Sequence, residues 1–272
     1  MAIVGSLMYD TDPLDANRLR ELLIMPGGLW RRIEVADETG STNADLAEWA
    51  RTGAAGDGTA LLTGYQSQGR GRLDRTWVAP PGSSLATSML VLPRIGDAQR
   101  WTWLPLICGM ATAEALRRST AVDAMLKWPN DVMVGDRKLC GILAERVETP
   151  DGPGCVIGVG INTDLTEEQL PVPWATSLAL LGASTRNKTT IATTLLRAFE
   201  LLYRQWQSDF DAAALATSYV ARCTTIGRQV KVVFGGGEVV GRAEAIDDHG
   251  RLVLQTSTGR QTFGAGDIVH LR

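Results

Sequence analysis

The sequence predicts an α+β protein in which a larger domain of strands and helices is followed by a small β-barrel. Helical apolar spacing and apolar runs of strand length intermingle up to about residue 222. After Thr225 only short strands and glycine-containing turns follow, and several such strands in fewer than fifty residues are typical of a small barrel. We therefore assign residues 1–222 to the larger domain, with 1–33 as a peripheral segment, and residues 223–272 to the barrel.

The first half of the larger domain is predicted from leucine spacing, helix caps and buried apolar runs. Four leucines between 14 and 23 share one helical face, and Pro26-Gly27-Gly28 ends that helix. Ser41 or Thr42 can cap a second helix, with Asp45 in its first turn, where the helix dipole favours an acid. The same hydroxyls and free N–H groups would also suit a ligand. These patterns predict helices over 15–25 and 41–50 and strands over 33–35, 59–65 and 83–92.

The second half is predicted from an apolar helix, a hairpin and a glycine-containing strand. Residues 101–119 are apolar on most helical faces, which predicts a central helix. Apolar residues from Ile191 to Trp206 form a helical stripe, and a short helix follows over 211–222. Between these helices we expect one strand over 125–134, a turn at 135–137, a returning strand over 138–145, and a strand over 155–163.

The net charge is −3, from 27 basic and 30 acidic side chains in 272 residues. A bulk nucleic-acid binder needs a surplus of positive charge. No apolar run reaches membrane-spanning length, and no secretory signal is apparent. Four widely spaced cysteines and only two histidines, His249 and His270, disfavour metal, redox and histidine-based catalytic sites. We expect a cytoplasmic protein that binds neither nucleic acid nor membrane.

The stretch most indicative of function is Gly69-Arg70-Gly71-Arg72-Leu73-Asp74-Arg75-Thr76-Trp77. Glycine allows a backbone to approach a ligand closely, and arginine offers a planar fork for carboxylate or phosphate oxygens. A tryptophan can stack on a flat ring. The stretch therefore predicts a loop that folds over a small anionic ligand such as a nucleotide; a solvated basic turn is the alternative.

Polar residues in the predicted hairpin and glycines in the next strand point to the same kind of site. Lys127, Asn130, Asp131 and Lys138 interrupt an otherwise apolar hairpin, although the lysines could also extend to solvent. Glycine within a strand, as in Gly158-Val159-Gly160-Ile161-Asn162, often marks close approach by a ligand.

In their order and spacing, these motifs resemble those of the biotin–protein ligases. The matching segments are Ser41-Thr42-Asn43, Gly69-Arg70-Gly71-Arg72 with Trp77, Lys127-Trp128-Pro129-Asn130-Asp131, Lys138-Leu139-Cys140-Gly141-Ile142-Leu143 and Gly158-Val159-Gly160-Ile161-Asn162. The resemblance runs from about Ile33 to the C-terminus. It implies a mixed β-sheet with packed helices, related to class II tRNA synthetase catalytic domains, and an SH3-like C-terminal domain.

The resemblance also implies a two-step reaction. The carboxylate of biotin attacks the α-phosphate of Mg-ATP, giving biotinoyl-5′-AMP and pyrophosphate. A lysine of the biotin carboxyl carrier domain of a biotin-dependent carboxylase then attacks this mixed anhydride. Mg²⁺ would arrive with ATP rather than occupy a fixed protein site, and no permanently bound cofactor is expected.

Site residues follow from the resemblance position by position. Arg72 and Lys138 would act as catalytic cations, and Asp131 would orient the acceptor lysine. Biotin would contact Ser41, Thr42, Asn43, Gln66, Gly69, Arg70, Gly71, Arg72, Lys138, Gly141 and Gly158. ATP or the adenylate would contact Arg72, Arg75, Trp77, Lys138 and Asn162, with Trp77 stacking on adenine and Asn162 bonding its edge.

Leu73 and Asp74 depart from the family pattern, which often has a basic residue or histidine and then glycine at these positions. An acid here lies near an anionic ligand and lacks the conformational freedom of glycine. The ordering of the loop and the role of Arg75 are therefore open.

Three other functions remain to be weighed. Lipoate–protein ligases share the fold and the adenylate chemistry, but Lys127-Trp128-Pro129-Asn130-Asp131 and the loop ending in Trp77 favour biotin. A non-enzymatic effector-binding protein would not need Arg72 and Lys138, and a barrel-bearing interaction module leaves the arginine loop unexplained. Many family members also repress genes through an N-terminal winged helix; the segment before Ile33 is too short for one, so we expect a ligase without DNA binding.

Overall fold

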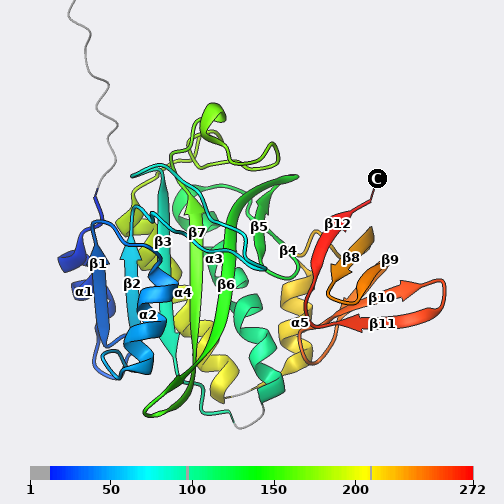
Figure 1. Cartoon of the computed structure of the whole chain (residues 1–272), viewed down its shortest axis with the longest axis horizontal. Helices are drawn as coiled ribbons and strands as arrows, with labels where there is room; N and C mark the ends of the chain where they lie inside the picture. Colours follow the sequence, from blue (N-terminus) through cyan, green and yellow to red (C-terminus); the bar gives the residue numbers. More distant parts are fainter. Residues whose placement is uncertain (1–12, 96–97, 209, 272) are drawn as a thin grey trace, which may run out of the picture.

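The computed structural model describes residues 13–95, 98–208 and 210–271, which form two sheets with helices packed on the larger one (Figure 1). The larger sheet has the strand order β1-β2-β3-β7-β6-β5-β4. Its strands are β1 (Arg32–Ala36), β2 (Thr59–Thr63), β3 (Ser84–Val91), β4 (Met125–Lys127), β5 (Asp131–Val134), β6 (Arg137–Thr149) and β7 (Gly152–Asn162). Because β1 and β2 are parallel and the other pairs antiparallel, the sheet is mixed, as predicted.

The α-helices agree with the expected positions to within a few residues. Ser41 is the N-cap of α2 and accepts a hydrogen bond from the Ala44 N–H, and Asp45 lies in the first turn, both as predicted. The helices are α1 (Ala16–Leu23), α2 (Thr42–Arg51), α3 (Trp103–Thr120), α4 (Lys188–Ser208) and α5 (Ala212–Val220), with short 3₁₀ turns η1 (Ala98–Thr102) and η2 (Glu167–Gln169). The N-terminal part of the expected peripheral segment, residues 1–12, lies outside the described residues.

The two faces of the large sheet have different coverings. Met89 of β3 and Ile157 of β7 belong to the main core with α3 and α4, whereas their neighbours Leu90 and Val156 pack with α2. This alternation follows from the two-residue period of a strand. Since α2 is short, it covers only part of its face (Figure 1). The uncovered part of that face forms the floor of the cavity described below.

The prediction of one strand over 125–134 is wrong. The chain reverses after Lys127 through a turn that includes the cis Trp128–Pro129 bond, and β4 pairs antiparallel with β5. Pro129 has no N–H to donate to a sheet ladder, which favours a break at this point. The reversal places Lys127 and Asp131 opposite one another in adjacent strands.

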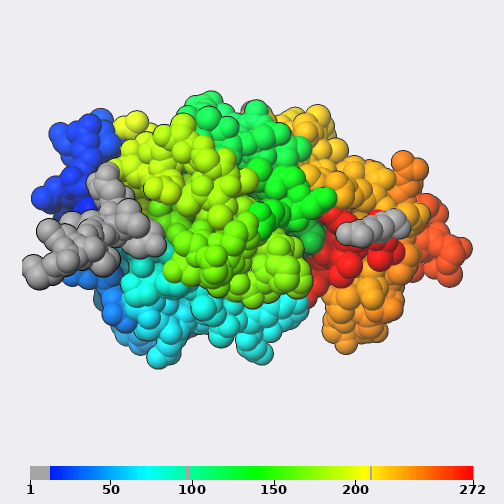
Figure 2. All heavy atoms as spheres, turned by 90° about the horizontal axis from the view of Figure 1, so that it is seen from above, coloured from blue at the N-terminus to red at the C-terminus, as the bar shows by residue number. Residues whose placement is uncertain are grey.

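The C-terminal residues form a separate five-stranded antiparallel sheet of order β11-β10-β9-β8-β12. Its strands are β8 (Gln229–Phe234), β9 (Gly237–Ile246), β10 (Leu252–Thr256), β11 (Gly259–Phe263) and β12 (Asp267–His270). Buried Trp128 joins the sheets, since its backbone N–H donates to Thr225 Oγ1 and its indole N–H donates to the Gly250 carbonyl. Figure 2 shows β12, in red, at the junction between the C-terminal sheet and the rest of the molecule.

Two features of the described residues concern compartment and redox chemistry. None of their helices is long and apolar enough to cross a membrane. The thiols of Cys108, Cys140, Cys155 and Cys223 are free and buried, and burial raises the pKa of each. A buried thiol with a raised pKa forms little thiolate, so these cysteines act as packing residues.

Candidate active site

A cavity of about 980 Å³ lies between the glycine-containing strands, the start of α2, the arginine loop and the C-terminal sheet. It gathers fourteen of the predicted site residues on its walls. These are Ser41, Thr42, Asn43, Gln66, Arg70, Gly71, Arg72, Arg75, Trp77, Asp131, Lys138, Gly141, Gly158 and Asn162. Gly69 is outside the lining, and its carbonyl accepts a hydrogen bond from the Trp77 backbone N–H. A Cβ on Gly69 would be 2.4 Å from the Trp77 carbonyl oxygen.

The floor of the cavity is a row of small residues in register across three strands. Ala86 of β3 pairs with Gly160 of β7, which in turn pairs with Gly141 of β6. The Trp77 ring lies on this row, because a Cβ on Gly160 would be 2.7 Å from the ring and one on Gly141 would be 3.1 Å from it. The missing side chains therefore make room for an indole from the arginine loop.

At one end of the cavity the start of α2 forms a neutral hydrogen-bonding surface. Gln66 Oε1 accepts from both the backbone N–H and the hydroxyl of Thr42, at 2.8 and 3.0 Å. Ser88 lies within hydrogen-bond distance of Thr42 Oγ1 and Asn43 Oδ1. A Cβ on Gly158 would stand only 2.2 Å from Asn43 Oδ1, so glycine at this position leaves space for the Asn43 amide.

The arginine loop is a tight hairpin that ends in a turn at Leu73 and Asp74. The Gly71 N–H donates to the Arg75 carbonyl and the Arg75 N–H donates to the Arg72 carbonyl. Leu73 and Asp74 have positive φ angles of 53° and 58°, as both central residues of a type I′ turn require. Both side chains are exposed. The acid that departs from the family pattern is thus at the solvent-exposed tip of the loop.

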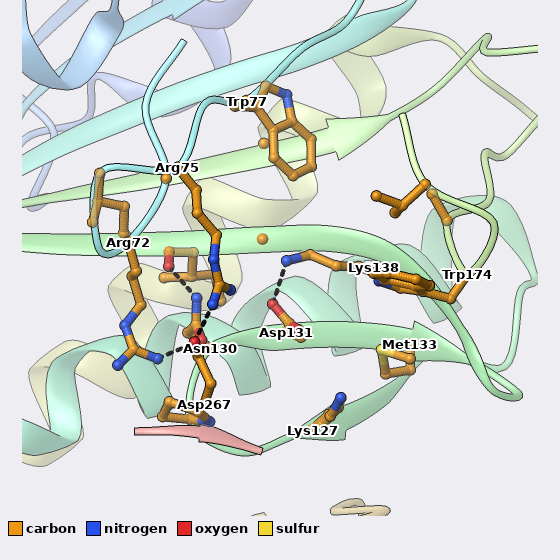
Figure 3. Close-up of a pocket in the computed structure, with 18 of the residues that line it drawn as sticks. Arg72, Arg75, Trp77, Lys127, Asn130, Asp131, Met133, Lys138, Trp174 and Asp267 are labelled. Carbon is orange, nitrogen blue, oxygen red and sulfur yellow. Dashed lines mark hydrogen bonds and ion pairs between the residues drawn. The ribbon is translucent and has the colours of Figure 1, made fainter. Parts of the chain in front are cut away.

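The opposite end of the cavity is strongly cationic and is built from both domains (Figure 3). Arg72 Nη1 donates to Asn130 Oδ1 at 2.9 Å and to the Gly266 carbonyl at 3.2 Å. Arg75 forms an ion pair with Asp267 of β12. Burial lowers the pKa of the Arg72 guanidinium, and the nearby charge of Asp267 opposes that shift.

Lys138 and Asp131 meet in the centre of the cavity wall. Lys138 Nζ is 2.6 Å from Asp131 Oδ1, and the Lys138 backbone N–H donates to the Trp174 carbonyl. Lys127 lies nearby on β4 and also lines the cavity. Burial lowers the pKa of Lys127, while the Asp131 carboxylate raises it. An anion that enters the cavity can therefore replace Asp131 as the partner of the Lys138 ammonium.

The side-chain amide of Asn162 already has a hydrogen-bond partner for its NH₂ group. Its Nδ2 group donates to the Thr176 carbonyl at 2.9 Å, and the side chain is buried at the end of β7. The segment that carries Thr176 also carries Trp174, which lines the cavity and is 60% exposed. An exposed tryptophan at a cavity wall offers a second flat surface beside Trp77.

Sequence reasoning missed cavity residues from the C-terminal sheet, from its approach and from the segment after η2. The missed lining residues include Trp174, Arg228, Asp267 and His270. His270 lies 3.3 Å from Thr225 Oγ1 and 3.5 Å from Arg228 Nη1. Trp174 and His270 are of residue types that often mark sites, but nothing local in the sequence places them in the wall of this cavity.

Comparisons with known proteins agree with this geometry. The biotin/lipoate A/B protein ligase family matches residues 35–162, and the biotin protein ligase C-terminal domain matches residues 225–271. The biotin–[acetyl-CoA-carboxylase] ligase of Mycobacterium tuberculosis is 42% identical over 96% of this chain and 97% of that protein. The bifunctional ligase/repressor BirA of Escherichia coli is 32% identical over 94% of this chain and 79% of its own length.

Solved structures give the same relationship. The biotin protein ligase from Aquifex aeolicus, in complex with biotin and ATP, superposes with a TM-score of 0.74 at 25% identity, covering 89% of this chain and 100% of that chain. Both sequence domains, the mixed sheet and the C-terminal sheet are therefore shared along nearly the whole length. The chain belongs to the biotin protein ligase family.

Proposed function

We propose that this chain joins biotin to ATP to form biotinoyl-5′-AMP and then transfers the biotinoyl group to a lysine of a carboxyl carrier domain. The observation that carries the proposal is the polarity of the cavity. Its α2 end offers uncharged hydrogen-bonding groups, whereas its far end concentrates cations. Biotin has the same polarity, with a neutral ureido ring at one end and a carboxylate at the other.

The charge of the cavity lining supports an anionic second ligand. Six arginine or lysine side chains and three aspartates line the cavity, in a chain whose net charge is −3. The lining thus carries an excess of three positive charges, opposite in sign to the net charge of the whole chain. Fixed cations in a partly desolvated pocket stabilise phosphates and a developing negative charge.

In the first step a biotin carboxylate oxygen bonds to the α-phosphorus of ATP, and the bond from that phosphorus to the bridging oxygen breaks to release pyrophosphate. Two anions must approach one another, so the reaction needs fixed cations more than a general base. Arg72 and Lys138 would supply them, and the hydrogen bonds of Arg72 to Asn130 and Gly266 support this role for it. Arg75 would face the leaving phosphates.

In the second step the acceptor amine attacks the carbonyl carbon of the mixed anhydride, loses a proton, and AMP leaves. Lys138 exchanges its contact with Asp131 for oxygens of the anionic ligand. The Asp131 carboxylate is then available to orient the acceptor ammonium and amine, the role that the sequence predicts for it. The carboxyl carrier domain of an acyl-CoA carboxylase is the acceptor that we propose.

The hydroxyl and amide groups around α2 would bind the ureido ring, since this ring both donates and accepts hydrogen bonds. Ser41, Thr42, Asn43 and Gln66 supply these groups. Adenine would stack on Trp77, with the exposed Trp174 as a second candidate surface, and its amine would donate to the remaining amide oxygen of Asn162.

The residues present fit a Mg²⁺ that is held mainly by phosphate oxygens and water. The described residues contain no group of three or more His, Cys, Asp or Glu side chains able to hold a metal. All three cavity aspartates are ion-paired, Asp131 with Lys138, Asp267 with Arg75, and the largely exposed Asp136 with Arg228. Such a Mg²⁺ needs only one or two carboxylates besides phosphates, and when bound it supplies neutralisation of the leaving pyrophosphate.

Exchange of labelled pyrophosphate into ATP tests the proposal. The protein is incubated with biotin, with lipoate and with neither, at equal concentrations. Exchange that depends on biotin supports the proposed function, and exchange that depends on lipoate alone identifies a lipoate ligase. Absence of exchange under all three conditions indicates a binding protein without turnover.

We also propose that the chain works in the cytoplasm as a ligase without a repressor role. A mobility-shift experiment with the full chain, biotin and ATP on promoter DNA checks the second part. Retardation that depends on DNA sequence would contradict it.

A further inference from the structure

One carboxylate outside the cavity lining holds two of the segments that form the α2 end of the cavity. This is the end where we propose that the ureido ring of biotin binds, and we call it the biotin end. Glu145 Oε1 lies 2.5 Å from Arg70 Nη2, and Glu145 Oε2 accepts from Asn43 Nδ2 at 2.9 Å. Glu145 is on β6, Arg70 is in the arginine loop, and Asn43 is in the first turn of α2. Glu145 is not among the described residues that line the cavity, and its carboxylate reaches the site through Arg70 and Asn43.

Hydrogen bonds continue from Glu145 across the whole neutral end. Asn43 Nδ2 also donates to the Leu143 carbonyl, and Asn43 Oδ1 lies 2.6 Å from Ser88 Oγ. Ser88 is in turn 2.7 Å from Thr42 Oγ1, which donates to Gln66 Oε1. A connected series of hydrogen bonds therefore links Arg70 of the arginine loop, through the side chain of Glu145, to Gln66, three residues after the end of β2.

The strand register provides the space that this series of hydrogen bonds needs. Ser88, Gly158 and Leu143 are neighbours across β3, β7 and β6, and Asn43 lies over Gly158. Glu145 is two residues beyond Leu143 on β6, so both project from the same face of the sheet. The Glu145 side chain is only 27% exposed, which limits the screening of its charge by water.

We infer that Glu145 is a positioning residue that fixes Arg70 and Asn43 for the ureido ring of biotin and neutralises Arg70 at that end. The charge balance of the two ends follows from this pair. With Arg70 paired to Glu145, the ureido end is neutral, whereas at the other end the Arg72 guanidinium donates to the neutral Asn130 and Gly266 and keeps its positive charge available. A ligand with a neutral ring and an acidic tail is therefore held with its tail toward Arg72 and Lys138. This inference rests on the proposed function.

The isosteric variant E145Q tests the role of the charge, with E145D as the conservative rescue. Biotin-dependent pyrophosphate exchange is measured at saturating ATP and then at saturating biotin. A lost charge-assisted hydrogen bond between partly exposed groups predicts a rise of about five- to tenfold in the KM for biotin. The kcat and the KM for ATP should stay within about twofold, and E145D should recover part of the loss.

A double-mutant cycle tests whether Glu145 acts through Arg70. If it does, E145Q/R70Q should raise the KM for biotin little more than R70Q alone, because contacting residues couple. The matched control is E148Q on the same strand, where Glu148 pairs only with exposed Arg146, and it should leave every constant unchanged.

Several results would overturn the inference. One is an unchanged KM for biotin in E145Q. Another is an equal rise in the KM for biotin and the KM for ATP together with a lowered Tm. The third is additive effects of E145Q and R70Q on the KM for biotin. Wild-type protein without biotin-dependent exchange would instead refute the proposed function, which keeps the two failures distinct.

Discussion

The two ends of the cavity achieve fixed geometry by different means. The biotin end is built within the large sheet and α2, from a chain of hydrogen bonds among mostly buried groups such as Thr42, Asn43 and Ser88. The phosphate end is the end with Arg72 and Arg75, where we propose that the phosphates of ATP bind. It is built across two domains from ion pairs, of which Arg75–Asp267 is partly exposed. Buried uncharged groups select a ligand by shape and hydrogen bonding, whereas partly exposed cations attract charge and respond to salt.

This difference suggests a division of labour between specificity and catalysis. Replacing a residue at the phosphate end should chiefly affect ATP and the rate of adenylation. Replacing a residue at the biotin end should chiefly affect the KM for biotin. The variants below test that separation, beginning with the largest expected effect.

Lys138→Ala should reduce biotin-dependent pyrophosphate exchange by about 10²- to 10³-fold. In the proposed first step this variant lacks the ammonium that faces the developing negative charge, and removal of one such group costs about this much in rate. The exchange rate at saturating biotin and ATP is the measurement. Lys231→Ala is the matched control, because Lys231 pairs with Glu238 on the C-terminal sheet. Full exchange by the Lys138 variant would refute the role assigned here.

Arg72→Gly should release the adenylate prematurely, and labelling of bystander lysines should rise about tenfold or more. The variant loses two hydrogen bonds from a charged group, each worth about 1.5–3 kcal/mol. Biotin incorporated into an unrelated protein, detected after denaturing electrophoresis, measures the release.

Leu73→Gly is the control for added glycine in this loop. Leu73 has a positive φ angle, which glycine adopts without strain, and no cation is lost. Its labelling should stay confined to the carrier domain. Equal bystander labelling by both variants would mean that loop flexibility, not the Arg72 charge, controls retention.

The sequence is most informative where structure depends on neighbouring residues. The α2 cap at Ser41, the glycines of β7 and the apolar stripe of α4 follow from local periodicity and local chemistry, and all are present. The wrong strand, over 125–134, is also a local matter, because the chain turns back at Pro129, which has no N–H for a sheet ladder.

The ionic partners of the loop arginines depend instead on contacts between distant residues. Arg70 pairs with a residue 75 positions away, and Arg75 pairs with one 192 positions away. No local pattern distinguishes Glu145 or Asp267 from other surface acids, because only the strand register and the docking of the C-terminal sheet bring them to the loop. The prediction could name the arginines of the loop but not the acids with which they pair.

Asp267→Asn should raise the KM for ATP by up to about fivefold and leave the KM for biotin unchanged. The Arg75–Asp267 pair is partly exposed, and such pairs contribute about 0–1 kcal/mol. Glu244→Gln is the control, since Glu244 pairs with Arg260 within the C-terminal sheet, away from the cavity. A rise in the KM for biotin equal to that for ATP would show that the two ends are not separate.

The smallest expected effect concerns the acid stability of the domain junction at His270. Burial, and after it the positive charges of Lys127 and Arg228, lower the pKa of His270 to about 4, while the charge of Asp136 opposes the shift. In the unfolded chain the imidazole has a pKa of about 6.5. Between these values the unfolded state binds more protons, so stability falls as the pH drops from about 6.5 to 4.

His270→Gln, which stays neutral, should therefore lose less Tm than the wild type over that pH range and match it above pH 7. Because His270 is only half-buried, the difference should be modest and should shrink as salt screens Lys127 and Arg228. Tm measured from pH 7.5 to 4 at low and high salt gives both results. Parallel curves of Tm against pH for the two proteins would mean that Lys127 and Arg228 do not disfavour a positive charge on His270. The part of the cavity formed by the C-terminal sheet would then not be as cationic as the comparison of the two ends requires.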